Sequence, residues 1–220
     1  MAGDALRWLA LAFLFCLQSG FAQTLPPKDL VADEQLSELR KLHDASDWEG
    51  ILGLVPSDVG SAEQCFYRGL ALSRLQQWEP ARQAFDAGQR IAPTDPRFPR
   101  ELAGALFQLK RPSEAKKALR KSLKLDPQDA YTRNFLATLF FMEDNLDAAL
   151  KYWNPTQKPF VDAIASNPQP RLRADILDRA FAIAPASLLR VEDLRNTEAW
   201  LDHLEIFPSY RFELRPKPGE

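Results

Sequence analysis

Hydrophobic and polar residues follow one another at helical spacing in the middle of the chain. In the stretch GLALSRLQQWEPARQAFDAGQRIAPTDP, residues 69–96, apolar residues recur three and four positions apart on both sides of a polar QQ pair. That spacing is typical of amphipathic helices, and a short polar interruption is typical of the turn between two of them. The stretch therefore predicts two antiparallel helices that end at a proline-containing loop.

This pattern returns with a period of 34 residues. Small residues, large apolar residues and prolines stay in register over three successive units, without a gap. A single helix pair of this kind cannot bury all its apolar surface, so neighbouring pairs are expected to stack. We expect Phe85, Leu119 and Trp153 to lie between the layers. The positions in register are Gly69, Ala103 and Ala137; Leu72, Leu106 and Phe140; Ala81, Ala115 and Ala149; Phe85, Leu119 and Trp153; and Pro93 and Pro127.

The arrangement of small, aromatic, alanine and proline positions resembles the tetratricopeptide repeat (TPR) family. The matching units are residues 62–95, 96–129 and 130–155, so TPR repeats are expected over 62–155. The resemblance implies an all-α fold, an α-solenoid of antiparallel helix pairs. The third unit departs from the pattern because it lacks the closing proline, and Pro155 is expected to end its second helix near Asn154.

Residues 28–61, which precede the repeats, contain two further helical patterns. Terminal units of a solenoid need atypical sequences because one of their faces meets water. We therefore interpret this stretch as a degenerate capping repeat, with an unrelated helical hairpin as the alternative. The apolar positions are Leu36, Leu39 and Leu42 on one helix face and Trp48, Ile51 and Leu54 on the other.

Residues 156–220 lose the 34-residue register and predict a small α+β segment. A short strand is expected over 160–165, helices over 171–185 and 191–207, and a strand in SYRFELRP, where apolar and charged residues alternate. This order resembles the start of a POTRA domain, the periplasmic module of outer-membrane barrel assembly proteins. The closing strand of such a module is missing, so we expect an incomplete module that continues in a longer polypeptide or pairs with another molecule.

The first 22 residues have the pattern of a secretory signal peptide. Arg7 precedes an uncharged run from Trp8 to Leu17, and the small residues Gly20 and Ala22 follow at the spacing that signal peptidase prefers. The run is too short to span a bilayer comfortably, which favours a cleaved signal peptide over an uncleaved anchor. We therefore expect an exported protein of the periplasm or cell envelope.

Charge and candidate chemistry narrow the function further. The 28 basic and 30 acidic residues give a net charge of -2 and are interspersed, which argues against nucleic acid or an anionic membrane surface as partner. His43 and His203 are far apart, and Cys65 is the single cysteine after the signal segment. No catalytic motif, metal-ligand spacing or phosphate loop is present. We expect no enzyme, no cofactor, no metal and no small-molecule substrate.

The first helices of the repeats remain as a candidate binding surface. In TPR proteins they line the concave groove, so the resemblance implies that residues projecting from them hold an extended or helical peptide. Aromatic residues would anchor the peptide, and Arg100 and Asn134 would bind its backbone or carboxylate. Phe66 and Phe141 are as well suited to the core. The predicted peptide-binding residues are Phe66, Leu70, Arg74, Arg97, Arg100, Phe107, Tyr131, Asn134 and Phe141.

The leading hypothesis is an exported TPR scaffold that mediates protein–protein interaction in the cell envelope. The expected partner is a protein or peptide, with a downstream domain of the same polypeptide as one candidate. The alternative hypothesis makes the chain the periplasmic N-terminal portion of an outer-membrane protein assembly or secretion component, associated with the outer membrane. The two-carboxylate clamp of chaperone-binding TPR proteins is absent, because those helix faces carry Phe66, Leu70, Gly104 and Tyr131.

Overall fold

The computed structural model describes residues 28–55, 60–167, 181–205 and 207–215, with side chains from Asp33 onward. The chain divides into two compact units, Met1–Lys41 and Leu42–Glu220. The predicted signal peptide lies outside the described residues. Of the helices in the described ranges, none combines the length and the apolar character that a membrane crossing requires.

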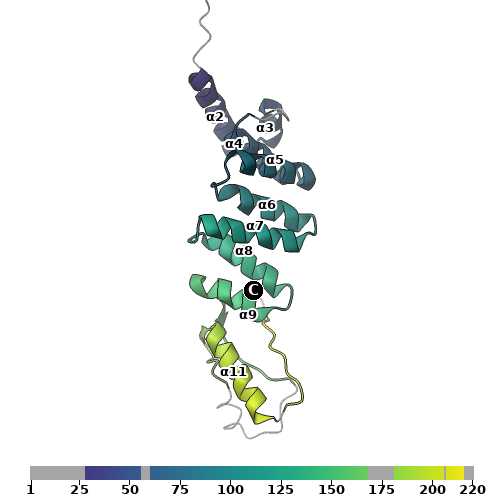
Figure 1. Cartoon of the computed structure of the whole chain (residues 1–220), viewed down its shortest axis with the longest axis vertical. Coiled ribbons are helices and arrows are strands. Elements are labelled where there is room, and N and C mark those ends of the chain that lie inside the picture. Colours follow the sequence, from purple (N-terminus) through teal and green to yellow (C-terminus); the bar gives the residue numbers. More distant parts are fainter. Residues whose placement is uncertain (1–27, 56–59, 168–180, 206, 216–220) are drawn as a thin grey trace, which may run out of the picture. The chain divides into compact units, whose positions relative to one another are not determined.

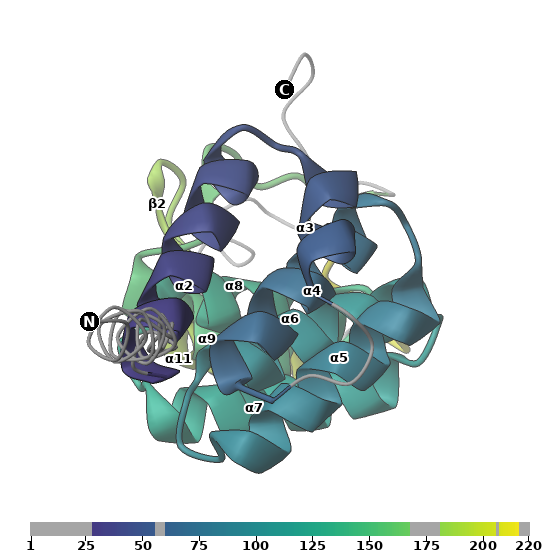
Figure 2. The same ribbon diagram turned by 90° about the horizontal axis from the view of Figure 1, so that it is seen from above.

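Consecutive helix pairs make up most of the second unit. The most extensive packing joins α4 to α5, α6 to α7 and α8 to α9, and each pair also packs on the next (Figure 1). The first helices of the pairs lie on one side and the second helices on the other (Figure 2). The predicted α-solenoid of helix pairs is confirmed. The bounds are α2 Lys28–Asp44, α3 Trp48–Leu54, α4 Ala62–Arg74, α5 Trp78–Ile91, α6 Arg97–Gln108, α7 Pro112–Leu125, α8 Ala130–Phe141 and α9 Leu146–Trp153.

The turns inside the pairs also repeat at the 34-residue spacing. Gln76, Lys110 and Asp144 adopt left-handed backbone conformations with φ of 58°, 61° and 57°. This conformation costs a residue other than glycine about 1–2 kcal/mol, so packing of the paired helices must offset it. In each turn an N–H reaches back across the left-handed residue to a carbonyl of the first helix, which satisfies the helix end. These bonds join Gln77 N to Leu72 O (2.8 Å), Arg111 N to Leu106 O (2.9 Å) and Asn145 N to Phe140 O (3.0 Å).

The core of the repeats is built around large side chains that fit against glycines. Phe85 and Phe98 are both fully buried. A Cβ atom at Gly69 would lie 2.4 Å from Phe85 Cε1, and one at Gly88 would lie 2.1 Å from Phe98 Cε1. The small residue at position 69 therefore makes room for the ring of Phe85, one of the predicted interlayer side chains. Leu119 is likewise fully buried, whereas Trp153, the third predicted interlayer residue, is half-buried.

The C-terminal segment contains a small sheet and the helix α11 (Val191–Leu204). Strand β1 (Phe160–Val161) pairs with β2 (Ser187–Leu188) in antiparallel register. The one-turn helix η1 (Asn154–Thr156) precedes them, and its first residue bonds to the junction between β2 and α11. Asn154 Nδ2 donates to the carbonyl of Leu189 at 2.8 Å, while its Oδ1 accepts from the N–H of Val191 at 2.9 Å. The predicted α+β character of this segment is confirmed.

Two strands in this segment differ from the prediction. The first is limited to β1, and residues 209–215 belong to no sheet among the described residues. The alternation in 209–215 survives as alternating burial, because Phe212 and Leu214 are half-buried whereas Arg211 and Glu213 are exposed. Alternation selects which side chains are buried, but a strand also needs a partner for its backbone. The helix expected over 171–185 lies mostly outside the described residues, and 181–185 are irregular.

Candidate functional site

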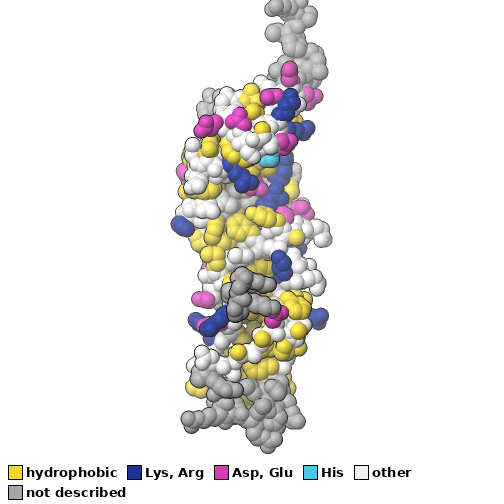
Figure 3. Space-filling model, turned by 180° about the vertical axis from the view of Figure 1, so that it is seen from behind, with side chains coloured by type: hydrophobic (Ala, Val, Ile, Leu, Met, Phe, Trp, Pro, Cys, Tyr) yellow, Lys and Arg dark blue, Asp and Glu magenta, His cyan; other side chains and the backbone are white. Residues whose placement is uncertain are grey.

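Three aromatic side chains on the first helices form a partly exposed cluster, which we call the aromatic patch: Phe107 of α6 and Tyr131 and Phe135 of α8. The Phe107 and Phe135 rings meet edge to face with centroids 5.8 Å apart, and Tyr131 lies 6.3 Å from Phe135. Phe107 and Phe135 are half-buried, but Tyr131 is 63% exposed. Gly104, one helical turn before Phe107, leaves open space, since a Cβ there would meet no atom within 4 Å. Hydrophobic side chains also gather on the molecular surface seen in Figure 3.

Arg97, which was predicted to bind a peptide, is already engaged within the protein. Its Nη2 lies 2.5 Å from Glu63 Oε1 and 2.7 Å from Asp95 Oδ2. Its guanidinium carbon lies 4.5 Å from the centroid of the Phe66 ring. The hydrogen bond to Asp95 and, to a smaller extent, the one to Glu63 raise the pKa of Arg97. Because these contacts join neighbouring repeats, Arg97 serves the stacking of the repeats rather than a free surface.

Arg100 is held less tightly and lies beside the aromatic patch. Its Nε donates to Glu101 Oε1 at 3.0 Å, and its Nη1 lies 3.4 Å from Asp129 Oδ2. Asp129 is itself the N-cap of α8 and accepts a 2.6 Å bond from the Thr132 hydroxyl. Burial acts to raise the pKa of Asp129, but the bonds from Thr132 and the charge of Arg100 outweigh it and the pKa is lowered. A ligand carboxylate can compete for Arg100 at its longer contact.

The first repeat contributes little accessible surface to the predicted site. Phe66 is only 9% exposed and packs edge to face on Phe98 at 5.8 Å. It therefore belongs to the core, because its ring fills the space between the first and second repeats. Leu70 is half-buried and packs against the same core. Arg74 is exposed, and its guanidinium lies 5.8 Å from the centroid of a ring of Trp48.

The last predicted residues lie at the far end of the repeats. Asn134 Oδ1 accepts a 2.7 Å hydrogen bond from the hydroxyl of Thr156, so part of its hydrogen-bonding capacity is used internally. Phe141 is 36% exposed, and its ring centroid lies 5.5 Å from that of Trp153. The structure thus brings Arg100, Phe107 and Tyr131 together, while Asn134 and Phe141 are at least partly structural.

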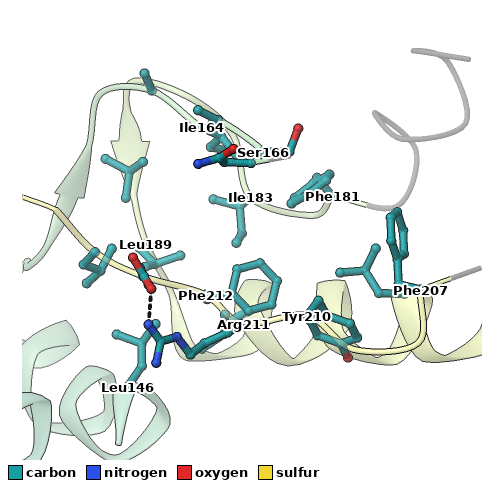
Figure 4. A pocket seen from close by; sticks show the side chains of 18 of the residues that line it. Leu146, Ile164, Ser166, Phe181, Ile183, Leu189, Phe207, Tyr210, Arg211 and Phe212 are labelled. Carbon is teal, nitrogen blue, oxygen red and sulfur yellow. Dashed lines mark hydrogen bonds and ion pairs between the residues drawn. The ribbon is translucent and has the colours of Figure 1, made fainter. Parts of the chain in front are cut away.

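A second concave feature lies in the C-terminal segment. A cavity of about 650 Å³ opens between the β1–β2 region, α11 and the extended residues 207–214. Figure 4 shows Ile183, Leu189 and Phe212 around its interior, and the ion pair of Arg211 with Glu213 borders it. The Tyr210 hydroxyl anchors the extended residues, because it lies 2.6 Å from Asp202 Oδ1 and 3.0 Å from the Glu198 carbonyl. The further apolar lining residues are Leu146, Val161, Ile164, Phe181, Leu194, Leu201, Phe207 and Leu214.

Two further kinds of site, a metal centre and a reactive thiol, find no support in the described residues. They contain no group of three or more His, Cys, Asp and Glu side chains arranged to hold a metal ion. Cys65 is fully buried, and burial raises the pKa of its thiol, which disfavours the reactive thiolate.

Sequence reasoning missed two parts of these sites. Phe135, the central ring of the aromatic patch, was not among the predicted residues. The signal was available, since Tyr131 and Phe135 are four positions apart and so share a helix face. The cavity could not be predicted, because it depends on residues 207–214 lying against α11 without joining a sheet.

Comparison with known proteins bears on the fold. No protein family model matches the chain, and no curated protein matches it. Among solved structures, MamA (residues 41 to the end) of Desulfovibrio magneticus RS-1 is similar, with 16% identity and a TM-score of 0.51 over 56% of this chain and 72% of that one. A crystal structure of MamA matches at 17% identity and a TM-score of 0.51, over 56% of this chain and 74% of that one. Together with the repeated helix pairs, this likeness shows that residues 62–153 have a tetratricopeptide-type fold.

Proposed function

We propose that this chain is a non-enzymatic scaffold that binds another protein through the first helices of its repeats. The main observation in support is the aromatic patch. There the exposed ring of Tyr131, the open space at Gly104 and the guanidinium of Arg100 lie close together. Aromatic rings that carry apolar area on a rigid helix are common anchors of protein interfaces, and a nearby arginine adds hydrogen-bond donors. The TPR-type fold supports this proposal, since stacked helix pairs present such surfaces.

Site-specific photocrosslinking tests the binding surface. A photoreactive phenylalanine analogue replaces Tyr131 in the full chain, expressed in its own cells. The matched control carries the same analogue at Ile91, which is 50% exposed on the second helix α5. We expect a protein adduct from position 131 that exceeds any from position 91. Equal adducts at both positions, or none at either, would contradict the proposal.

A substitution at Gly104 provides an independent check of the same surface. Gly104→Trp places a large ring in the space beside the patch, where an added Cβ meets no atom within 4 Å, whereas Phe135→Ala removes the central ring. Both variants should lose the adduct at position 131 while retaining a cooperative thermal unfolding transition. Mass spectrometry of the adduct then distinguishes a separate envelope protein from another segment of the same polypeptide.

The proposal includes export to the periplasm or cell envelope, which rests on the sequence pattern of residues 1–22. Cell fractionation of the full chain and of a variant that begins at Gln23 tests it. We expect the full chain in the envelope or periplasmic fraction, shortened at its N-terminus, and the variant in the cytoplasm. Recovery of both forms in the cytoplasm would overturn this part of the proposal.

A further inference from the structure

Helix α7 differs from its neighbours in charge. It carries five basic residues and one acidic residue, a net charge of +4, although the whole chain has a net charge of -2. The second helices on either side, α5 and α9, have equal numbers of acidic and basic residues. The positive charge is therefore concentrated on the middle helix of the three, which lies between α5 and α9 in the stack (Figure 1).

Part of this charge is neutralised within the protein. Arg111, just before α7, forms a double hydrogen bond with Glu114 at 2.7 and 2.8 Å. Lys116 pairs with Glu143, and its ammonium also lies 4.9 Å from the centroid of the Phe140 ring. Arg120 lies 5.4 Å from that centroid. Lys116 and Arg120 are thus directed at neighbouring elements of the fold, and Arg111 binds Glu114, the only carboxylate of α7.

Three lysines remain, and we call them the lysine row: Lys117, Lys121 and Lys124. Their spacing of four and three residues places them on one face of α7, opposite the buried residues Ala118 and Ser122. Lys117 and Lys124 are exposed and Lys121 is half-buried. Within the described residues none of the three ammonium groups has a hydrogen bond or an ion pair.

The carboxylates of the neighbouring second helices, α5 and α9, already have partners of their own. Glu79 pairs with Arg82 at 2.8 Å and Asp86 with Arg90 at 3.5 Å, both within α5. In α9, Asp147 pairs with Lys151 at 3.0 Å and with Arg195 at 2.7 Å. The lysine row is therefore a narrow strip of ammonium groups without ion pairs, flanked by helices that carry no net charge. Glu114, at the start of α7, is bound by Arg111, and the charge of Lys117 adds to the lowering of its pKa.

We propose that the lysine row binds an acidic segment of a partner protein in an extended conformation. The α-helix rises about 1.5 Å per residue, so Lys117 and Lys121 are about 6 Å apart along the axis. Alternate side chains of an extended peptide repeat at about 6.6 Å, which matches that step. Glutamate or aspartate at two alternate positions would thus face Lys117 and Lys121, while Lys124, about 4.5 Å beyond Lys121 along the axis, adds positive charge at the end of the row. This surface is formed by the second helices and is separate from the aromatic patch on the first helices.

The narrow width of this basic surface favours an acidic protein segment over other polyanions as the ligand. A membrane or a nucleic acid presents a wide array of phosphates, and binding it requires a broad basic surface. Here the flanking helices carry paired charges with no net charge, so the positive surface is one helix wide. An extended peptide is narrow enough to lie along one helix. Exposed ion pairs are individually weak and are screened by salt, so binding through this row should fall steeply as salt concentration rises.

Fluorescence anisotropy with the full chain tests the proposal. The probe is a labelled peptide of alternating Glu and Ser, compared with a peptide of alternating Gln and Ser. We expect the Glu peptide to bind at low salt and the Gln peptide not to bind. The triple variant K117Q/K121Q/K124Q should bind the Glu peptide about tenfold more weakly, the effect expected for the loss of several exposed ion pairs.

The matched control removes three positive charges elsewhere, in the variant K41Q/R90Q/K151Q. It should retain affinity within about twofold, as should Tyr131→Ala in the aromatic patch, because long-range charge effects are screened at moderate salt. An equal loss in the control triple variant would show that net charge alone attracts the peptide, and would overturn the proposal. Tighter binding of phosphatidylglycerol vesicles or of duplex DNA that is lost in K117Q/K121Q/K124Q would also overturn it, in favour of a phosphate surface.

Discussion

The repeats and the C-terminal segment bury their apolar side chains to different extents. In the repeats, large rings such as Phe85 and Phe98 are completely enclosed, because each helix pair is covered by the next. In the C-terminal segment, Leu189 and Leu194 form a small buried cluster with Leu150 of α9, and a cavity of about 650 Å³ lies beside it. Periodic stacking thus closes a core from both sides, whereas short extended runs without backbone partners leave apolar side chains around open space.

The largest expected difference between the two regions concerns a single aromatic ring. Phe85→Ala should lower the free energy of unfolding by about 3–5 kcal/mol, because it removes a fully buried ring and leaves a cavity. Phe160→Ala in β1 should change it by less than about 0.5 kcal/mol, since Phe160 is 64% exposed. Urea unfolding of both variants measures the contrast. Similar losses in the two would mean that stacking does not enclose Phe85 as described.

Alanine substitutions at two glycines of the repeats, Gly88 in the core and Gly104 at the surface, should have opposite effects on stability. Gly88→Ala places a methyl group 2.1 Å from Phe98 Cε1, so the ring must move, and we expect a loss of about 1–3 kcal/mol. Gly104→Ala meets no atom within 4 Å and gains helix propensity, so we expect a gain of up to about 1 kcal/mol. Thermal unfolding followed by circular dichroism measures both. A loss in Gly104→Ala would show that the space beside the aromatic patch is filled.

The repeat region was more predictable from the sequence than the roles of its side chains. The period of 34 residues located the helix pairs, because equivalent positions in a stacked array meet equivalent surroundings. Helical spacing alone could not show that Phe66 is enclosed, since each helix has apolar side chains on more than one face. The occupation of Arg97 by Glu63 follows from a contact between equivalent positions of adjacent repeats. Pairing positions one period apart would have revealed it.

Two further features could not be inferred from local patterns. Residues 209–215 alternate in burial as a strand does, but whether they join a sheet depends on backbone partners that no local pattern specifies. The lysine row is visible in the sequence KKALRKSLK. Whether these lysines have acidic partners, however, depends on which residues the fold brings next to them. Basic residues that are interspersed with acidic ones along the whole chain still gather on one helix, once the acidic residues nearby are paired elsewhere. The resemblance of the last residues to a POTRA domain stays a prediction.

The smallest expected effect concerns the ion pair that joins the two regions. Arg195 of α11 donates to Asp147 of α9 through two bonds of 2.7 and 3.2 Å. The bond from Arg195 is the main cause of the lowered pKa of Asp147; partial burial opposes it, and Lys151 adds to it. A carboxyl group with a lowered pKa in the folded state contributes stability above its unfolded pKa of about 3.9 and loses that contribution as the pH falls through the lowered folded value.

Asp147→Asn should therefore loosen α11 at pH 6 and have little effect at a pH below the folded pKa, where Asp147 is protonated in both states. Amide hydrogen exchange of α11, compared between the two proteins at each pH, measures this difference. The matched control is Asp86→Asn, which removes a carboxylate that pairs with Arg90 inside α5 and should leave α11 unchanged at both pH values. Faster exchange of α11 in Asp147→Asn at low pH as well would show that the side-chain shape, and not its charge, holds the C-terminal segment to the repeats.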